Sequence, residues 1–335
     1  MAKKSNLLEG SIQFKPFHYP WAYEAWEQQQ RIHWLPEEVP LGEDTKDWAN
    51  RLSPEEKNLL TQIFRFFTQA DVEVNDCYMT KYAQIFQPTE IRMMLAAFSN
   101  METIHIAAYA LLLDTVGMPE NEYGAFLEYE EMKNKSDYLH EFEVRDEHGE
   151  IDRRGVAKTL AVFSAFTEGV QLFSSFIILL NFTRFGKMKG MGQIVTWSVR
   201  DESLHCESMI KLFRTFIKEN RDIWDDELKG EIYCIAAKIV ELEDKFIDLA
   251  FEQGGIEGLE AEEVKQYIRY ICDRRLIELG MKSIFHVRTN PLEWVDYILN
   301  GVEHSNFFES RSTEYSKAAS KGTWEEAFEI HNMEK

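Results

Sequence analysis

The chain has 335 residues and a formal net charge of −21 at pH 7. A surface with this much negative charge is repelled by the phosphates of nucleic acids and of anionic membranes, so neither is an expected partner. Glycine and proline are scarce and aromatic residues are plentiful, which favours an all-α protein with a large core.

The four cysteines are scattered and form no Cys-x-x-Cys pair, which argues against a disulfide framework or a zinc knuckle. The basic first residues lead into no apolar stretch of signal-peptide length. The most apolar run, residues 161–182, is interrupted by Glu168 and Gln171, so we do not expect it to span a membrane. These features predict a soluble, cytoplasmic protein.

Helices are predicted along most of the chain. Residues 21–34 form a short, Trp-rich helix after an irregular start. The motif Ser53-Pro54-Glu55-Glu56 predicts a helix start, with serine as N-cap and glutamate three residues later. This second helix extends to about Phe86, before Gln87-Pro88-Thr89. The third contains the apolar stretch 94–114 and ends near Gly117.

The second half of the chain continues this pattern. A short helix is expected within residues 118–150, and the charged stretch from Asn134 to Asp152 is typical of a surface loop. Further helices are predicted over residues 156–185, 191–219, 225–252 and 261–285, with Asn290-Pro291 capping another. No alternation of apolar and polar residues is long enough to build a sheet.

Two of the predicted helices carry the same charged motif in apolar surroundings. Glu102 and His105 are three residues apart in the third helix, and Glu202 and His205 repeat this spacing in the helix over 191–219. The spacing places both side chains on one face of a helix. Burying a carboxylate and an imidazole is costly unless they are paired. Glu-x-x-His offers a metal ion two ligands from one helix.

Each Glu-x-x-His helix is preceded by a helix that places one carboxylate opposite the motif. Asp71 and Glu102 are placed almost symmetrically about the Pro88 turn, and Glu168 and Glu202 about the Gly186 turn. Antiparallel helices would therefore bring each pair to the same height. The resulting set of four carboxylates and two imidazoles is expected of a di-iron or di-manganese carboxylate site in a helical bundle.

Simpler interpretations exist for each residue alone. One Glu-x-x-His match can arise by chance in a Glu-rich chain, and a lone buried Asp71 or Glu168 is more often a hydrogen-bonded core residue. The joint pattern on two apolar hairpins favours the dinuclear site. Its oxygen and nitrogen donors suit iron or manganese better than zinc, which takes fewer ligands. Glu73 points to the far side of its helix and is not an expected ligand.

Tyr109 lies one turn after His105, on the same stripe of the helix. A buried tyrosine usually only finds a hydrogen-bond partner. Beside an O2-activated metal pair, however, a phenol can be oxidised, and apolar neighbours would protect the radical. The sequence leaves both roles open.

Four segments together resemble the small, radical-generating subunit of class I ribonucleotide reductase. The similarity extends from Trp34-Leu-Pro-Glu-Glu-Val39 to Asn306-Phe-Phe-Glu309 and covers most of the chain. Its motifs are Ala70-Asp71, Met101-Glu-Thr-Ile-His-Ile-Ala-Ala-Tyr109, Thr167-Glu168-Gly169 and Val199-Arg-Asp-Glu-Ser-Leu-His205. The family implies a ferritin-like helical bundle with a dinuclear metal-carboxylate site in its core.

The resemblance also implies roles for individual residues. Tyr109 would be the stable radical, and Trp34, Asp201 and His105 the buried path of radical transfer, continued by Tyr315 in the tail. The metal ligands would be Asp71, Glu102, His105, Glu168, Glu202 and His205. Phe176 would line the radical pocket, whereas Leu172 and Ser198 stand where the family has a bulky aromatic and an aliphatic residue.

The implied protein is the small subunit of ribonucleoside-diphosphate reductase, an oxidoreductase that makes deoxyribonucleotides for DNA replication. Residues 1–305 would form the metal domain and residues 306–335 a flexible tail that docks on the large subunit, with Trp324 and Phe328 as anchors. The family further implies a homodimer, O2 as oxidant and two iron ions, with Mn/Mn or Mn/Fe as alternatives. The alternatives in function are a di-iron oxidase or desaturase and a ferritin-like metal-storage protein.

Overall fold

The computed structural model describes residues 6–10 and 13–298. Within this part the regular elements are all helical and no strand forms, which confirms the predicted all-α, ferritin-like class. The chain divides into two compact units, Met1–Leu292 and Glu293–Lys335. In the second unit residues 293–298 are helical.

The first unit is built from long helices joined by short segments. In chain order its elements are α1 (Pro20–Arg31), η1 (Pro36–Glu38), α2 (Gly42–Asn50), α3 (Pro54–Asp76), η2 (Cys77–Tyr82), α4 (Ala83–Ile85), α5 (Thr89–Val116), η3 (Glu120–Glu128), α6 (Glu130–Leu139), α7 (Arg153–Leu160), η4 (Ala161–Gln171), α8 (Leu172–Arg184), α9 (Lys189–Glu219), η5 (Arg221–Ile223), α10 (Asp226–Ala250) and α11 (Ala261–Glu278).

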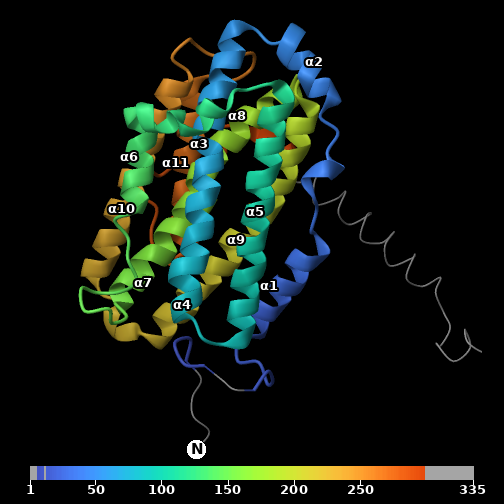
Figure 1. The fold of residues 1–335 in the computed structure, drawn as a ribbon. Coiled ribbons are helices and arrows are strands. Elements are labelled where there is room, and N and C mark those ends of the chain that lie inside the picture. The colour runs from blue at the N-terminus through green and yellow to red at the C-terminus, as the bar shows by residue number, and fades with distance from the viewer. Residues whose placement is uncertain (1–5, 11–12, 299–335) are drawn as a thin grey trace, which may run out of the picture. The chain divides into compact units, whose positions relative to one another are not determined.

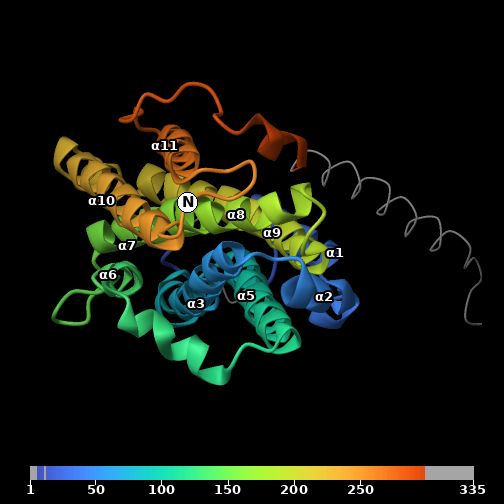
Figure 2. The ribbon, with the colours of Figure 1, turned by 90° about the horizontal axis from the view of Figure 1, so that it is seen from above.

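These helices form layers. Figures 1 and 2 show α3 beside α5 in one layer, and α8 beside α9 in the next. The α5 and α9 helices contact each other across the layers, and α1 packs on both of them. The α10 and α11 helices contact each other and cover η4. The core between these layers is where the two Glu-x-x-His motifs are placed.

Local sequence explains where the main helices begin. The Ser53 hydroxyl accepts a hydrogen bond of 3.2 Å from the Glu56 amide, and the Ser53 amide donates one of 3.0 Å to the Glu56 carboxylate, which confirms the predicted capping box. The start of α9 is held from outside: the amides of Gly190 and Met191 donate to Asp44 at 2.9 and 2.8 Å. These bonds satisfy donors that a helix N-terminus leaves unpaired.

Two predicted boundaries were wrong. The stretch predicted as a surface loop from Asn134 belongs to α6 as far as Leu139, and Lys135 is buried there. The last long helix ends at Glu278 instead of residue 285. There the backbone turns at Gly280, whose φ of 87° is in the left-handed region that favours glycine.

Two long helices also change their winding in a way that the sequence did not predict. The helix from Pro54 to Ile85 contains the π-helical segment η2, and the helix from Arg153 to Arg184 contains the longer π-helical segment η4. Such segments are rare in proteins overall, and those that do occur often lie at functional sites.

The helix Arg153–Arg184 is long and apolar enough to cross a membrane. However, every residue from Ala161 to Phe182 is buried inside the protein. It is therefore the central helix of the core, as the interrupting Glu168 and Gln171 indicated.

Candidate metal centre

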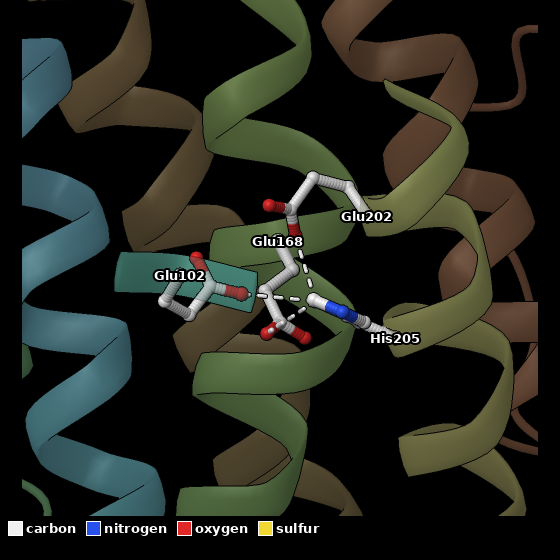
Figure 3. Close-up of side chains that lie close together, drawn as sticks. All are labelled: Glu102, Glu168, Glu202 and His205. Carbon is white, nitrogen blue, oxygen red and sulfur yellow. Dashed lines mark ion pairs between the residues drawn. The ribbon is translucent and has the colours of Figure 1, made fainter. Parts of the chain in front are cut away.

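The six expected metal ligands lie together between the helix layers. Asp71 comes from α3, Glu102 and His105 from α5, Glu168 from η4, and Glu202 and His205 from α9. Each is at most 2% exposed. Figure 3 shows the carboxylates of Glu102, Glu168 and Glu202 pointing toward the ring of His205.

The expected ligands form two groups that share one residue. Asp71, Glu102 and His105 each offer a ligand atom within 4.8 Å of the others, and so do Glu102, Glu168, Glu202 and His205. Two adjacent groups bridged by a common carboxylate are the arrangement that a pair of metal ions requires.

Both imidazoles turn the same nitrogen toward the carboxylates. His105 Nδ1 lies 3.0 Å from Glu202 Oε1 and 3.6 Å from Glu102 Oε2. His205 Nδ1 lies 2.9 Å from Glu102 Oε1 and 3.5 Å from Glu202 Oε2. The opposite nitrogen, Nε2, has a polar partner in each case: Asp201 Oδ2 at 3.2 Å for His105, and Gln29 Oε1 at 3.0 Å for His205. Metal-binding histidines are oriented in this way by a partner on the far nitrogen.

Many of the buried atoms in this cluster lie close to one another but form no hydrogen bond of acceptable geometry among the described residues. They are Asp71 Oδ2, both Glu102 oxygens, Glu168 Oε2, both Glu202 oxygens and His205 Nδ1. Leaving even one buried polar atom unpaired costs about 1–3 kcal/mol. Donors of this number and kind fit two iron or manganese ions, which take carboxylate oxygens and imidazole nitrogens.

Protons compensate part of the charge in the metal-free cluster. Burial, together with the neighbouring Glu102 carboxylate, raises the pKa of Asp71 well above its usual value, and burial and Glu202 do the same for Glu168. Burial opposes the ionisation of Glu102 as well, but its two histidine neighbours outweigh this and lower its pKa to about 2. The pKa of His205 rises to about 10 because Glu102 and Glu202 outweigh burial. Metal binding would displace such protons.

A hydrogen-bonded chain leads from the cluster to Trp34. The Trp34 indole N–H donates to Asp201 Oδ2 at 2.8 Å, and the same oxygen lies 3.2 Å from His105 Nε2. The centroids of the Trp34 and His105 rings are 6.0 Å apart, and the ring planes are inclined by 29°. Gln29, which the sequence did not single out, donates weakly to Asp201 at 3.4 Å and thereby links it to His205. Trp34 and Asp201 are both buried.

Tyr109 is fully buried next to the cluster. Its hydroxyl donates to Ser198 Oγ at 3.2 Å. Its ring meets Phe67 edge-on at 4.5 Å, and Phe67 in turn contacts Phe176 at 5.3 Å. Burial raises the pKa of Tyr109 and keeps the phenol protonated. Ser198, which stands where the family has an aliphatic residue, thus supplies the hydrogen-bond acceptor for Tyr109.

Tyr78, which the sequence did not single out, makes a direct hydrogen bond to one of the expected ligands. It lies in η2, and its hydroxyl donates to Glu168 Oε1 at 2.7 Å. Both residues stand in π-helical segments, so the two rare segments meet at this bond. Tyr78 follows Asp71 by two helical turns, and this spacing is the signal that could have identified it.

Other expected residues lie elsewhere. Glu73 is buried and accepts a hydrogen bond from the Ser136 hydroxyl, and it belongs to neither ligand group. The four cysteines are free. Tyr315, Trp324 and Phe328 lie outside the described residues, as does the expected tail 306–335.

Most of the chain is similar to known proteins. Residues 11–291 match the model of the family described as ribonucleotide reductase, small chain. The chain is 45% identical to the probable ribonucleoside-diphosphate reductase small subunit of Invertebrate iridescent virus 6, over 96% of this chain and 98% of that protein.

Solved structures with the same fold have lower identity. The R2 subunit of ribonucleotide reductase from Clostridium botulinum superposes with a TM-score of 0.79 at 23% identity, over 86% of this chain and 91% of that one. The dimanganese(II)-NrdF of Streptococcus sanguinis gives 0.74 at 21% identity, over 88% and 99% of the two chains.

Proposed function

The chain belongs to the ribonucleotide reductase small-chain family, subunits of an oxidoreductase, and from this premise we propose how it works. It assembles a dinuclear metal centre, uses O2 to oxidise Tyr109 to a stable radical, and passes the oxidising equivalent to the large catalytic subunit. That subunit would then reduce ribonucleotides to deoxyribonucleotides.

The observation that carries this proposal is the pair of ligand groups that share Glu102, with their unpartnered buried atoms. We propose that Asp71, Glu102 and His105 hold one ion and that Glu168, Glu202 and His205 hold the other, with Glu102 between them. Two iron ions are the first choice. Mn/Mn and Mn/Fe stay as alternatives, since the same donors accept either metal.

When bound, the metal pair would supply the oxidising power that the side chains lack. The chain's own residues would position Tyr109 for oxidation and then carry the oxidising equivalent toward the large subunit. Ser198 fixes the phenol oxygen of Tyr109, and Phe67 excludes water from one side of its ring. The hydrogen bonds from Trp34 through Asp201 to His105 support their proposed role as the path of radical transfer, which Tyr315 would continue.

The remaining parts of the proposal come from the family resemblance. Residues 1–305 would form the metal domain, and residues 306–335 would dock on the large subunit. The protein would act in the cytoplasm as a homodimer. These stay predictions.

Electron paramagnetic resonance tests the central claim. The protein is loaded with Fe(II) without oxygen and then exposed to O2, beside a Tyr109→Phe control. We expect an organic radical in the wild type and none in the control. If iron and manganese both load but neither gives a radical, even with an activating partner added, the chain is an oxidase or a storage protein.

Deleting the residues after Tyr315 tests the docking claim. Reductase activity with the large subunit should be lost while metal loading and radical formation are retained. Activity that survives this deletion would show that the large subunit binds elsewhere.

A further inference from the structure

A surface pocket at the C-terminal end of α9 is lined by cations and apolar side chains. Its volume is about 420 Å³, and its walls come from the end of α9, the segment that follows it and the turn after α11. Five of its lining residues are Arg214, Lys218, Arg221, Trp224 and Leu279. No carboxylate lines this pocket in the part of the chain that the structure describes. In a chain of net charge −21, a pocket with only positive charge is unusual.

The three cations repel one another. Arg214 and Lys218 are four residues apart, and Lys218 and Arg221 are three apart, a spacing at which like charges destabilise a helix. All three residues are exposed, and none of their side chains forms an ion pair or a hydrogen bond among the described residues. Cations do stabilise a helix C-terminus, but that effect is confined to the last turn, which Arg214 precedes. A bound anion would relieve the repulsion.

The carboxylates closest to these cations in the sequence are already bound to other groups. Glu219 accepts hydrogen bonds from the Leu7 amide at 3.0 Å and from the Tyr19 hydroxyl at 2.6 Å. Asp222 forms an ion pair of 2.6 Å with Arg153. The chain therefore supplies no counterion to the pocket from these positions.

The rest of the pocket is apolar and includes an indole. Trp224 is partly exposed, and its ring meets that of Phe213 edge-on with centroids 5.8 Å apart. Phe213 and Leu279 are buried and also line the pocket. An aromatic side chain beside cations is the combination on which a nucleotide base can stack while its phosphates are neutralised.

We propose that this pocket binds a nucleoside triphosphate, with the phosphates on Arg214, Lys218 and Arg221 and the base against Trp224. Guanidinium groups bind phosphate oxygens through two parallel hydrogen bonds, and lysine adds a point charge. An inorganic anion would use the cations alone and would leave the indole without a role. The proposed function brings nucleotides to the complex, but the pocket's own residues carry this inference, and it requires neither metal nor radical.

The first test is isothermal titration calorimetry of the full-length wild-type protein with ATP, inorganic triphosphate and adenosine, at low salt with EDTA. We expect one ATP to bind per chain. Inorganic triphosphate should bind about ten-fold more weakly because it lacks a base to stack, and adenosine should bind more weakly than either. A chain that does not bind ATP, or that binds it no more tightly than inorganic triphosphate or adenosine, would overturn the proposal.

The second test replaces the cations. Arg214→Ala and Arg221→Ala should each weaken ATP binding about ten-fold, because each removes hydrogen bonds between charged groups. Arg221→Lys keeps the charge and should lose less. Trp224→Phe keeps an aromatic ring and should retain the preference for ATP over inorganic triphosphate. Unchanged ATP affinity in both alanine variants would overturn the assignment of the phosphates.

Arg31→Ala is the matched control. Arg31 is an exposed arginine on α1 that pairs with Glu27 at 3.2 Å and does not line the pocket. Its loss changes the net charge equally and should leave the ATP affinity unchanged, so an equal loss in the control would overturn the site. Where a variant does not fold, the comparison of the three ligands still decides the question in wild-type protein.

Failure of this proposal and failure of the proposed function give different results. Wild-type protein that binds ATP as expected but forms no radical at Tyr109 would contradict the function and leave the nucleotide site intact. Protein that forms the radical but does not bind ATP would overturn only the nucleotide site.

Discussion

Replacing Glu102 with glutamine is expected to remove both metal ions, because Glu102 belongs to both ligand groups. Replacing Asp71 with asparagine should affect only the group that contains it. Metal ions that bind only the folded chain stabilise it by mass action. An ion whose free concentration is one hundred times its Kd adds about 2.7 kcal/mol to the free energy of unfolding. Two ions therefore add roughly 5 kcal/mol. In a chain of this size that corresponds to a rise in Tm on the order of 10 °C.

The assay combines calorimetry with metal analysis. Wild type, Glu102→Gln and Asp71→Asn are melted with and without Mn(II), and bound metal is counted after desalting. We expect the full rise in Tm for wild type, about half of it for Asp71→Asn, and almost none for Glu102→Gln. The metal content should fall in the same order.

Glu73→Gln is the matched control for these variants. Glu73 is buried two residues after Asp71, but its partner is Ser136 and it belongs to neither ligand group. Its replacement should leave the metal content at the wild-type level. Glu102→Gln protein that still binds two ions and melts like metal-loaded wild type would refute a centre bridged by Glu102.

Three further predictions concern the surroundings of the centre and the core. Tyr78→Phe removes the donor that orients Glu168, and metal affinity measured by titration should fall roughly 10–100-fold. Gly169→Ala would place a Cβ 2.6 Å from the Arg275 side chain. The free energy of unfolding, measured with denaturant, should therefore fall by about 1–3 kcal/mol. Lys135→Met leaves its buried partner Glu243 uncompensated, which should cost about 3–5 kcal/mol by the same measurement.

Each of these three variants has a matched control of the same residue type. Tyr82 donates to a backbone carbonyl instead of a ligand, so Tyr82→Phe should keep the metal affinity. Gly230 has free space around it inside α10, and Gly230→Ala should stabilise by up to about 1 kcal/mol. Lys133 forms a solvent-exposed ion pair with Asp137, so Lys133→Met should lower the free energy of unfolding by less than about 1 kcal/mol. An equal effect in variant and control would contradict the corresponding prediction.

The sequence predicted those features that depend on spacing along a regular helix. Glu102 and His105 share a face because residues three apart in a helix are neighbours, and the all-α class follows from helical patterning. Lys135 was misplaced in a surface loop, because lysine is almost never buried without a partner. That partner, Glu243, stands 108 positions away, 2.7 Å from the lysine Nζ. No local pattern indicates such a pair.

The sequence placed Glu168 among the expected ligands but predicted neither the π-helical winding of η4 nor the contact of Glu168 with Tyr78. Extra residues in a turn rotate the following side chains relative to a regular α-helix, so helical spacing does not give the direction of Glu168. The wider turns also alter the backbone hydrogen bonding, and the Gly169 carbonyl accepts a bond of 3.2 Å from Arg275 Nε of α11. On the other side Tyr78, itself in a π-helical segment, holds Glu168 Oε1. Glu168 is thus oriented by contacts from distant parts of the chain, and the bulk that alanine adds at position 169 should disturb the metal centre as well as the core.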